Sequence, residues 1–395
     1  MNRLLILFFV TVVDVLGFGI VIPLLPYMGD RFGASPAVIT WILMSYSACQ
    51  FISAPVWGRL SDRFGRRPIL LTSFAGAFVS YLILGFSTTL AGLLLSRIIG
   101  GLMAGNISAL LAYASDISKP EDRAKSLGMI GAGIGIGFML GPAIGGVLAG
   151  NDIAAANFLQ PAIVSACLAV LAVLLVSFVL PESLSAEQRA HAHARRTGES
   201  SWQMLARLPG LRRITLAALI VVTAQAILES VTGLWALKRF GYGPMTVGLI
   251  LFGLAFVAVV FQGGLIRVLV PKFGERRLAI AGACGYVFGL MTMGLAPSFG
   301  LSMLGLGLCA AGQGMWQPSG SSLASKQSSA GNRGAVMGIY QSSSSMARII
   351  GPAISGPLFG AFGPSAPFIV GSVIALAAVV LLTRPLDDVA APGHE

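Results

Sequence analysis

The sequence contains few charged residues. Lys, Arg, Asp and Glu make up 10% of the 395 residues, whereas 55% of the residues are hydrophobic. Soluble proteins average about 25% charged residues, so this chain has too few charges to cover the surface of a soluble protein of its length. The composition therefore predicts an integral membrane protein.

Cysteine and histidine are also scarce. The four cysteines lie in apolar segments and the three histidines in polar ones, at unrelated positions: Cys49, Cys167, Cys284, Cys309, His191, His193 and His394. This distribution argues against a disulfide framework or a metal site; for His191 and His193, a solvated linker is favoured over metal binding. Because the sequence shows no nucleophile–base pair and no large soluble domain, we expect no enzyme activity.

Long apolar stretches dominate what is present. Twelve of them approach the roughly 20 residues that cross a membrane, near residues 4–27, 38–58, 69–87, 90–112, 124–149, 158–180, 214–237, 245–270, 278–296, 301–324, 334–361 and 366–383. A signal peptide is the alternative for the first stretch, but Asp14 interrupts it and no small-x-small cleavage site follows. We therefore expect an all-α integral membrane protein with twelve transmembrane helices.

The chain also repeats itself once. Residues 118–148 align without a gap with residues 328–358, with nine identical positions. Shorter segments return in the same order: RFGASP at 31–36 as RFGYGP at 239–244, and RFG at 63–65 as KFG at 272–274. Because both halves run in the same direction, the repeat predicts two parallel copies of one six-helix unit.

One long polar connection divides the apolar stretches into six and six. It predicts an N-terminal six-helix bundle at 1–181, a cytoplasmic linker at 182–213 and a C-terminal six-helix bundle at 214–395. Within the linker, residues 203–208 are expected to form a short amphipathic helix on the membrane surface. The acidic tail from Asp387 is expected to be disordered.

Positive charge is concentrated on one side of the expected membrane. Of the 26 Lys and Arg residues, 21 lie near the chain ends or in even-numbered connections between the apolar stretches. This positive-inside bias places both termini in the cytoplasm. It also explains the net charge of +11 by contact with a lipid bilayer, so no nucleic-acid partner is expected.

The connection after the second apolar stretch reads GRLSDRFGRRP at residues 58–68. In it, Gly65 allows a tight turn, and Asp62 can cap a helix or accept paired hydrogen bonds from an arginine. An ordinary basic loop is the alternative, but the complete spacing argues against it. The loop resembles the signature of the major facilitator superfamily, and the repeat and the twelve stretches agree with this resemblance.

Three further segments narrow the resemblance. The pattern G-x8-G-x3-GP-x2-GG, the mark of the drug/proton antiporter branch, is matched by Gly128, Gly137, Gly141, Pro142, Gly145 and Gly146. Residues 94–101 resemble the fourth-helix motif with its buried arginine, and residues 14–26 resemble the first helix of that branch. The chain is most similar to twelve-helix tetracycline/proton antiporters. The resemblance implies the major facilitator fold, a small-molecule substrate and the proton gradient, rather than a cofactor, as the energy source.

The resemblance also implies a conformational latch at the cytoplasmic helix ends. Its residues would be Asp62 and Arg66, with Asp116 as the partner of Arg66, in a loop that contains Gly58 and Gly65. The latch would favour the outward-facing state. The alternative for Asp116 is an ordinary residue at the end of a helix.

Four charged residues fall inside apolar stretches: Asp14, Arg97, Glu229 and Arg348. Such a residue costs at least about 2.5–3.5 kcal/mol on insertion scales, so it usually faces a cavity or a partner. Asp14 is expected near the midplane of the membrane, where burial favours its neutral form and a nearby Arg97 favours its charged form. We therefore interpret Asp14, opposite Arg97, as a proton-coupling acid; a static ion pair with Arg97 is the alternative.

Glu229 marks a departure from the resembled pattern. It lies four residues after Gln225, on the same face of a helix. The tetracycline type usually has an uncharged polar residue here and an essential acid in the ninth helix, yet residues 278–296 contain no acid. This difference argues against transport of a tetracycline–metal complex. Glu229 is the candidate substitute in proton coupling or cation binding; the alternative is a polar residue near the outer rim.

Polar and aromatic side chains on several stretches could together line a substrate pocket. The candidates are Tyr46, Gln50, Asn106, Gln225, Gln313, Trp316, Gln317, Tyr340, Gln341, Ser344 and Arg348. Any one of them is more often a contact between helices than a ligand contact. As a set near the repeat interface, they favour a binding cavity.

The sequence thus predicts a monomeric bacterial inner-membrane transporter that exports small lipophilic or amphiphilic compounds by proton-coupled alternating access. One alternative is uptake or exchange of a metabolite or lipid by the same fold, which transport direction under a pH gradient would distinguish. A second alternative, a membrane receptor that does not transport, would show no substrate flux.

Overall fold

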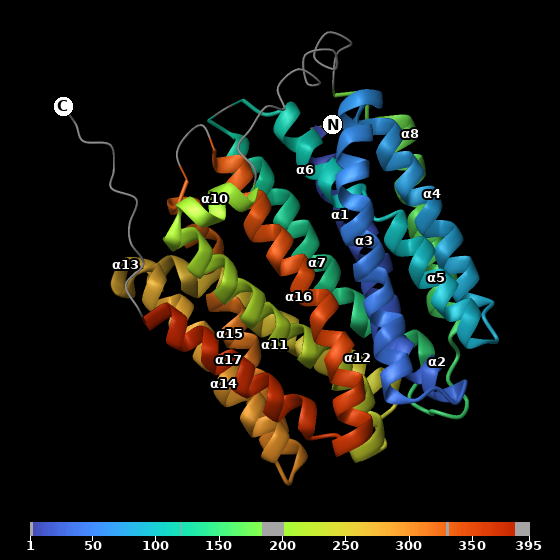
Figure 1. Cartoon of the computed structure of the whole chain (residues 1–395). Helices are drawn as coiled ribbons and strands as arrows, with labels where there is room; N and C mark the ends of the chain where they lie inside the picture. The colour runs from blue at the N-terminus through green and yellow to red at the C-terminus, as the bar shows by residue number, and fades with distance from the viewer. Residues whose placement is uncertain (1–2, 120, 184–200, 329–331, 384–395) are drawn as a thin grey trace. The chain divides into compact units, whose positions relative to one another are not determined.

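The computed structural model describes residues 3–119, 121–183, 201–328 and 332–383. All regular secondary structure in these ranges is helical (Figure 1). The predicted disordered tail and residues 184–200 of the predicted linker, including His191 and His193, lie outside the described residues.

The described residues of the first half form six long helical segments. They are α1 (Arg3–Val21) continued by η1 (Ile22–Leu24) and α2 (Leu25–Arg31), α3 (Pro36–Phe64), α4 (Arg66–Gly85), α5 (Leu90–Leu102) followed by α6 (Asn106–Asp116), α7 (Arg123–Ala149) and α8 (Leu159–Val179). Each segment overlaps one of the first six predicted apolar stretches.

The described part of the second half forms six more. They are α11 (Pro209–Phe240), α12 (Pro244–Val260) continued by the π-helical η2 (Phe261–Leu265) and α13 (Ile266–Phe273), α14 (Glu275–Leu295), α15 (Phe299–Lys326), α16 (Arg333–Phe362) and α17 (Ala366–Thr383). A short helix, α10 (Ser201–Arg207), lies within the predicted linker and overlaps residues 203–208, where a short amphipathic helix was expected.

Ten of the described segments are long and apolar enough to cross a membrane. The other two long helices, α15 and α16, contain 28 and 30 residues and are not among these ten. The prediction of an all-α membrane protein built from long helical segments is therefore confirmed.

Proline and glycine determine where several helices break. Pro23 and Pro26 lie where α1 passes through η1 into α2, as expected for a residue that lacks the N–H of the helix ladder. Gly65 and Gly274, with φ of +103° and +77°, end α3 and α13 in a conformation that favours glycine. These two glycines are the repeat-related glycines of the RFG and KFG segments.

Contacts between Cα atoms group the chain into two compact units. Unit 1 comprises Met1–Arg196 and Gly233–Gly253, and unit 2 comprises Thr197–Thr232 and Leu254–Glu395. The end of α11 and the start of α12 therefore belong to unit 1. The division into bundles at 1–181 and 214–395 with a linker between them stays a prediction.

In unit 1, α1 packs against α7 and α8, and α4 packs against α5 and α8 (Figure 1). Leu7 of α1, Leu70 and Phe74 of α4 and Leu110 of α6 are fully buried in one apolar cluster. The cluster holds the helix ends that carry the candidate site in a fixed arrangement.

In unit 2, α14 packs against α15 and α17. The approach of α14 to α15 depends on glycine, because a Cβ atom at Gly285 would lie 2.8 Å from the Cα of Gly312. Small residues of this kind allow membrane helices to pack closely where no hydrophobic effect drives them together.

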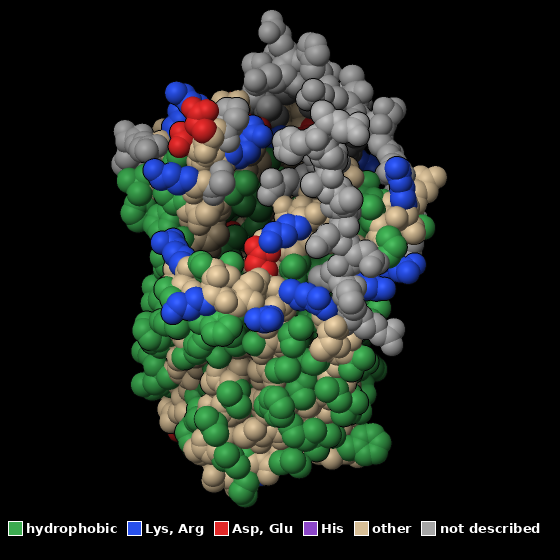
Figure 2. Space-filling model, turned by 90° about the vertical axis from the view of Figure 1, so that its left-hand side faces the viewer, with side chains coloured by type: hydrophobic (Ala, Val, Ile, Leu, Met, Phe, Trp, Pro, Cys, Tyr) green, Lys and Arg blue, Asp and Glu red, His purple; other side chains and the backbone are tan. Residues whose placement is uncertain are grey.

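Charged and apolar side chains are separated on the surface. On the face shown in Figure 2, Lys and Arg gather across the upper part, and hydrophobic side chains cover most of the surface below. Large apolar residues such as Phe178 and Phe362 are 83% and 76% exposed. Soluble proteins rarely expose such extensive apolar surface, whereas lipid covers it in a membrane.

Candidate functional site

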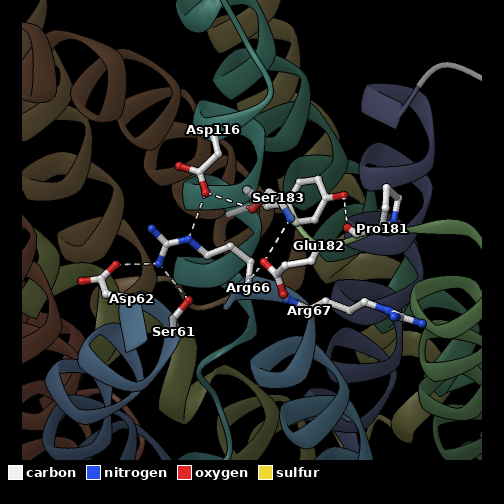
Figure 3. Close-up of polar contacts among 9 residues, drawn as sticks. Ser61, Asp62, Arg66, Arg67, Asp116, Pro181, Glu182 and Ser183 are labelled. Atoms are coloured by element: carbon white, nitrogen blue, oxygen red, sulfur yellow. Dashed lines mark hydrogen bonds and ion pairs between the residues drawn. The ribbon is translucent and has the colours of Figure 1, made fainter. Parts of the chain in front are cut away.

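Arg66 lies at the centre of a polar cluster that joins α3, α4 and α6 (Figure 3). Its Nη1 donates to Asp62 Oδ1 at 2.7 Å and to Ser61 Oγ at 2.9 Å. Its Nε donates to Asp116 Oδ2 at 3.0 Å. The structure thus brings together Asp62, Arg66 and Asp116, the three charged residues of the predicted latch. We call them, with Ser61, the latch cluster.

The latch cluster is only partly shielded from water. The Arg66 side chain is 11% exposed, and those of Asp62 and Asp116 are 37% and 21% exposed. Ion pairs near water contribute up to about 1 kcal/mol each, while the planar guanidinium imposes a definite geometry. The cluster therefore orients three helix ends through contacts of modest strength.

Two residues that sequence reasoning missed complete this cluster. Glu182 accepts hydrogen bonds from the backbone N–H groups of Arg66 at 2.9 Å and Arg67 at 3.2 Å. Ser183 Oγ donates to Asp116 Oδ2 at 3.0 Å. The sequence signal was available, because a helix that begins with two arginines needs an acid near its positive end.

The structure also explains why glycine precedes Arg66. A Cβ atom on Gly65 would fall on the Glu182 carboxylate. Gly65 therefore provides both the positive φ of the turn and the space for that carboxylate. Gly58, in contrast, faces open space, with no heavy atom within 4 Å of a Cβ placed there.

Asp14 occupies the middle of α1, where it is half-buried. Its Oδ2 accepts a short hydrogen bond from Asn106 Nδ2. Asn106 is the first residue of α6, directly after the break between α5 and α6. The break thus brings the amide of a predicted pocket residue to the predicted coupling acid.

Arg97 does not form the static ion pair with Asp14 that was the alternative to a proton-coupling role. No ion pair within 4.0 Å joins the two residues in the described part of the chain, and the described partner of Asp14 is Asn106. Arg97 is only 2% exposed, and its guanidinium lies 5.7 Å from the ring centroid of Tyr46, within cation–π range. The static Asp14–Arg97 ion pair is therefore not the arrangement that this structure shows.

The antiporter-motif glycines mainly allow α7 to approach α1. A Cβ atom at Gly137 would lie 2.7 Å from Val15 Cβ, and one at Gly141 would lie 2.6 Å from Gly19 Cα. A Cβ at Gly145 would overlap the Ile20 carbonyl. The spacing of these glycines therefore reflects a seam between two helices.

The other motif residues have different surroundings. A Cβ atom at Gly146 would lie 2.6 Å from the Pro244 carbonyl oxygen, and one at Gly248 would overlap the Pro142 carbonyl. The end of α7 thus meets the start of α12 within unit 1. Gly128 has open space where a Cβ would be, so the structure gives no steric reason for glycine there.

Unit 2 contains the second pair of intramembrane charges. Gln225 Nε2 donates to Glu229 Oε1 at 2.7 Å, and Arg348 Nη1 lies 3.4 Å from Glu229 Oε2. The side chains of Arg348 and Glu229 are 46% and 45% exposed. The structure therefore joins three predicted residues from α11 and α16 in one polar group.

The remaining predicted pocket residues are divided between the units. Tyr46 and Gln50 of unit 1 and Gln313 and Ser344 of unit 2 are half-buried, Gln317 and Gln341 of unit 2 are exposed, and Trp316 and Tyr340 of unit 2 are buried. The burial of Trp316 and Tyr340 favours a packing role for these two. Their joint pocket stays a prediction.

The Major Facilitator Superfamily matches this sequence over residues 7–271 and 263–394. The chain belongs to this superfamily. It is thus a membrane transporter rather than an enzyme, and the predictions of family and fold are confirmed.

The proteins similar to this chain include drug resistance proteins and an organic anion transporter. The class D tetracycline resistance protein of Salmonella ordonez is 29% identical over 97% of both chains. Multidrug resistance protein 2 of Bacillus subtilis (strain 168) is 31% identical over 87% of this chain and 85% of its own length. The crystal structure of the human organic anion transporter MFSD10 is 25% identical, covers 96% of this chain and 98% of that chain, and has a TM-score of 0.72.

Proposed function

We propose that this transporter exports small lipophilic or amphiphilic compounds in exchange for protons. The observation that carries the proposal is Asp14, a half-buried carboxylate in the middle of α1 that is bound to Asn106. An ionisable residue within a membrane helix is costly and usually serves a function. The similarity to proteins named for tetracycline and multidrug resistance supports export.

Helix α6 offers a physical path from the proposed proton site to the latch cluster. Its first residue, Asn106, is bound to Asp14, and its last residue, Asp116, is bound to Arg66. The charged carboxylate needs the amide donor, whereas protonation weakens this need. Proton binding would therefore loosen the contact at the first residue of α6, while the latch cluster still holds the last residue. The conformations with the latch closed and open would then differ in proton affinity.

Glu229 is the second proposed coupling acid. Because Gln225 and Arg348 both bind its carboxylate, a change in its protonation or a bound cation would alter the polar group that joins α11 and α16. The only acid in the described α14 is Glu275, at its first residue. Since this carboxylate is bound to Lys326 and Ser322, it does not replace the mid-helix acid of the tetracycline type.

Uptake or exchange of a metabolite or lipid is the second candidate function. The exposed guanidinium of Arg348 favours this alternative for anionic compounds, since it could bind a carboxylate in place of Glu229. The similarity to a human organic anion transporter supports it as well. We further propose a monomer in a bacterial inner membrane, with both termini in the cytoplasm.

Flux measurements in proteoliposomes test these proposals. Purified protein would be reconstituted, an acidic lumen imposed, and accumulation of ethidium, Hoechst 33342, magnesium–tetracycline and fluorescein measured. Export by antiport predicts that a lipophilic probe accumulates in the acidic lumen of vesicles whose cytoplasmic face is outward, and that a proton ionophore abolishes this accumulation. Movement of a probe with the protons would instead support uptake, and no flux of any probe would count against both.

A further inference from the structure

The segment directly after α8 contacts the latch cluster and its surroundings at several points (Figure 3). The Pro181 carbonyl accepts a hydrogen bond from the Tyr113 hydroxyl at 2.5 Å. Glu182 accepts the N–H groups that open α4, and Ser183 donates to Asp116. Residues 181–183 are therefore bound to both α4 and α6.

The start of α4 needs such a contact for a physical reason. The first N–H groups of a helix have no partner within the helix, and the helix dipole places partial positive charge there. The first turn of α4 contains no acid, and Gly65 supplies no side-chain cap. Arg66 and Arg67 add two positive charges at this end. The Glu182 carboxylate offsets this unfavourable arrangement from a different segment.

The same contact determines where Arg66 lies. Glu182 holds the backbone nitrogen of Arg66, and the side chain of Arg66 then reaches Asp62 and Asp116. On the far side, Asp116 Oδ2 accepts from both Arg66 Nε and Ser183 Oγ. Removal of residues 182–183 from this position would free two N–H groups and weaken the orientation of both latch partners.

We propose that Glu182 and Ser183 are positioning residues of the latch, through which the first residues of the predicted linker hold it closed. The proposal rests on the latch of the proposed function. It adds that Glu182 and Ser183, the first two residues of the predicted linker, take part in the conformational cycle. A displacement of the linker at Glu182 would release Arg66, and release of Arg66 would free the start of the linker.

Hydrogen exchange at the start of α4 tests the contact directly. Full-length protein in nanodiscs would be compared as wild type, Glu182→Gln, Glu182→Ala and the control Glu121→Gln, which alters an exposed acid. Exchange in peptides that contain Arg66 and Arg67 should rise severalfold in Glu182→Ala, less in Glu182→Gln, and not in Glu121→Gln. Unchanged exchange in Glu182→Ala would overturn the proposal.

A conformational measurement separates positioning from helix capping alone. With the four native cysteines replaced, the variant Gln341→Cys would be labelled from the cytoplasmic side by an impermeant maleimide. Glu182→Ala and Ser183→Ala should raise the labelling rate, as Asp62→Asn should, at an unchanged elution profile. If exchange rises in Glu182→Ala but the labelling rate equals that of wild type, the positioning role is wrong.

These outcomes are distinguishable from failure of the proposed function. Hydrogen exchange and labelling need no transported substrate. A wild type that moves no probe under a pH gradient would refute proton-coupled export, and a labelling shift in the same preparation would still support the role of Glu182 in the latch.

Discussion

The first residues of α4 and α14 occupy equivalent positions in the two repeats, and both helices begin with the same local structure. Each helix begins directly after a glycine with positive φ. The second residue of each is an arginine that binds the end of a later helix: Arg67 donates to the Ser177 carbonyl of α8, and Arg276 donates to the Leu382 carbonyl of α17. In both units, therefore, the glycine turn and the helix start that follows it are bound to the end of a later helix. We call this segment the turn of each unit.

The ion pair at this turn has opposite polarity in the two units. In unit 1, Arg66 at the helix start pairs with Asp116 at the end of α6. In unit 2, Glu275 at the helix start pairs with Lys326 at the end of α15, at 2.7 Å. The same two positions are joined in both units, but the acid and the base have changed places.

This reversal decides which helix depends on another segment. Glu275 gives α14 an acid in its own first turn, where the helix dipole favours it. Helix α4 begins with a base and obtains its acid from Glu182. The turn of unit 1 is consequently bound to the predicted linker, and we expect the conformational cycle to act there rather than at the more self-contained turn of unit 2.

The intramembrane charges differ in a comparable way. Unit 1 binds its acid, Asp14, to an amide and buries its base, Arg97, against an aromatic ring. Unit 2 pairs its acid and base, Glu229 and Arg348, directly at a half-exposed position. An acid without a directly paired base is the better proton carrier, because its charge is not needed to neutralise a partner.

Among the variants that test this comparison, Asp14→Asn should have the largest effect, which is on uphill transport. The variant keeps the shape of the side chain but cannot exchange a proton, so uphill transport should fall to the background level while downhill exchange of the probe remains. Probe accumulation against its gradient in proteoliposomes measures the effect. Normal uphill accumulation at equal expression would show that Asp14 is not the coupling acid.

The second-largest effect is expected when the base at the start of α4 is replaced by an acid, as at the start of α14 in unit 2. Arg66→Glu should place two further repulsions beside Asp62 and Asp116, and should change the cytoplasmic labelling rate by roughly tenfold, equivalent to about 1.4 kcal/mol. The double variant Arg66→Glu/Asp116→Lys restores one attraction and should recover part of this change. No recovery would contradict the view that the two turns are equivalent with reversed charge.

Glu229→Gln should have a moderate effect. The variant retains a partner for Gln225 but loses the charge that attracts Arg348, so coupling or cation affinity should fall while neutral probes still exchange passively. Substrate-induced proton release and probe affinity measure these changes. If both match the wild type, Glu229 is a rim residue and Asp14 is the sole coupling acid.

The helices and the charged latch residues could be predicted from sequence, for identifiable reasons. Apolar length fixes a membrane helix whatever its neighbours are. The spacing of Asp62 and Arg66, read through the family resemblance, placed Asp116 with them. These features depend on local pattern or on a shared motif.

The partners of Asp14 and of α4 could not be predicted in the same way. The choice between Asn106 and Arg97 depends on how the chain turns at residues 103–105, which separate α5 from α6. Glu182 lies 116 residues from Arg66 in a segment that reads as a polar linker. Only the need of α4 for an acid pointed towards such a contact, and that need does not say which acid fulfils it.

The smallest effect is expected from Lys326→Gln in the unit 2 turn. The Lys326 side chain is 64% exposed, and an ion pair so open to water contributes less than about 1 kcal/mol. Glu275 retains the hydrogen bond from Ser322 and its place at the positive end of α14. Thermal stability and cytoplasmic labelling should therefore remain close to those of wild type.

The matched variant in unit 1 is Asp116→Asn, which should change the labelling rate clearly, because Asp116 binds both Arg66 and Ser183. If Lys326→Gln changed labelling as strongly as Asp116→Asn, the turn of unit 2 would be a second working latch. The two turns would then differ only in which helix supplies the acid and which the base of the ion pair. The contact of the unit 1 turn with the predicted linker would have no distinct effect on the conformational cycle.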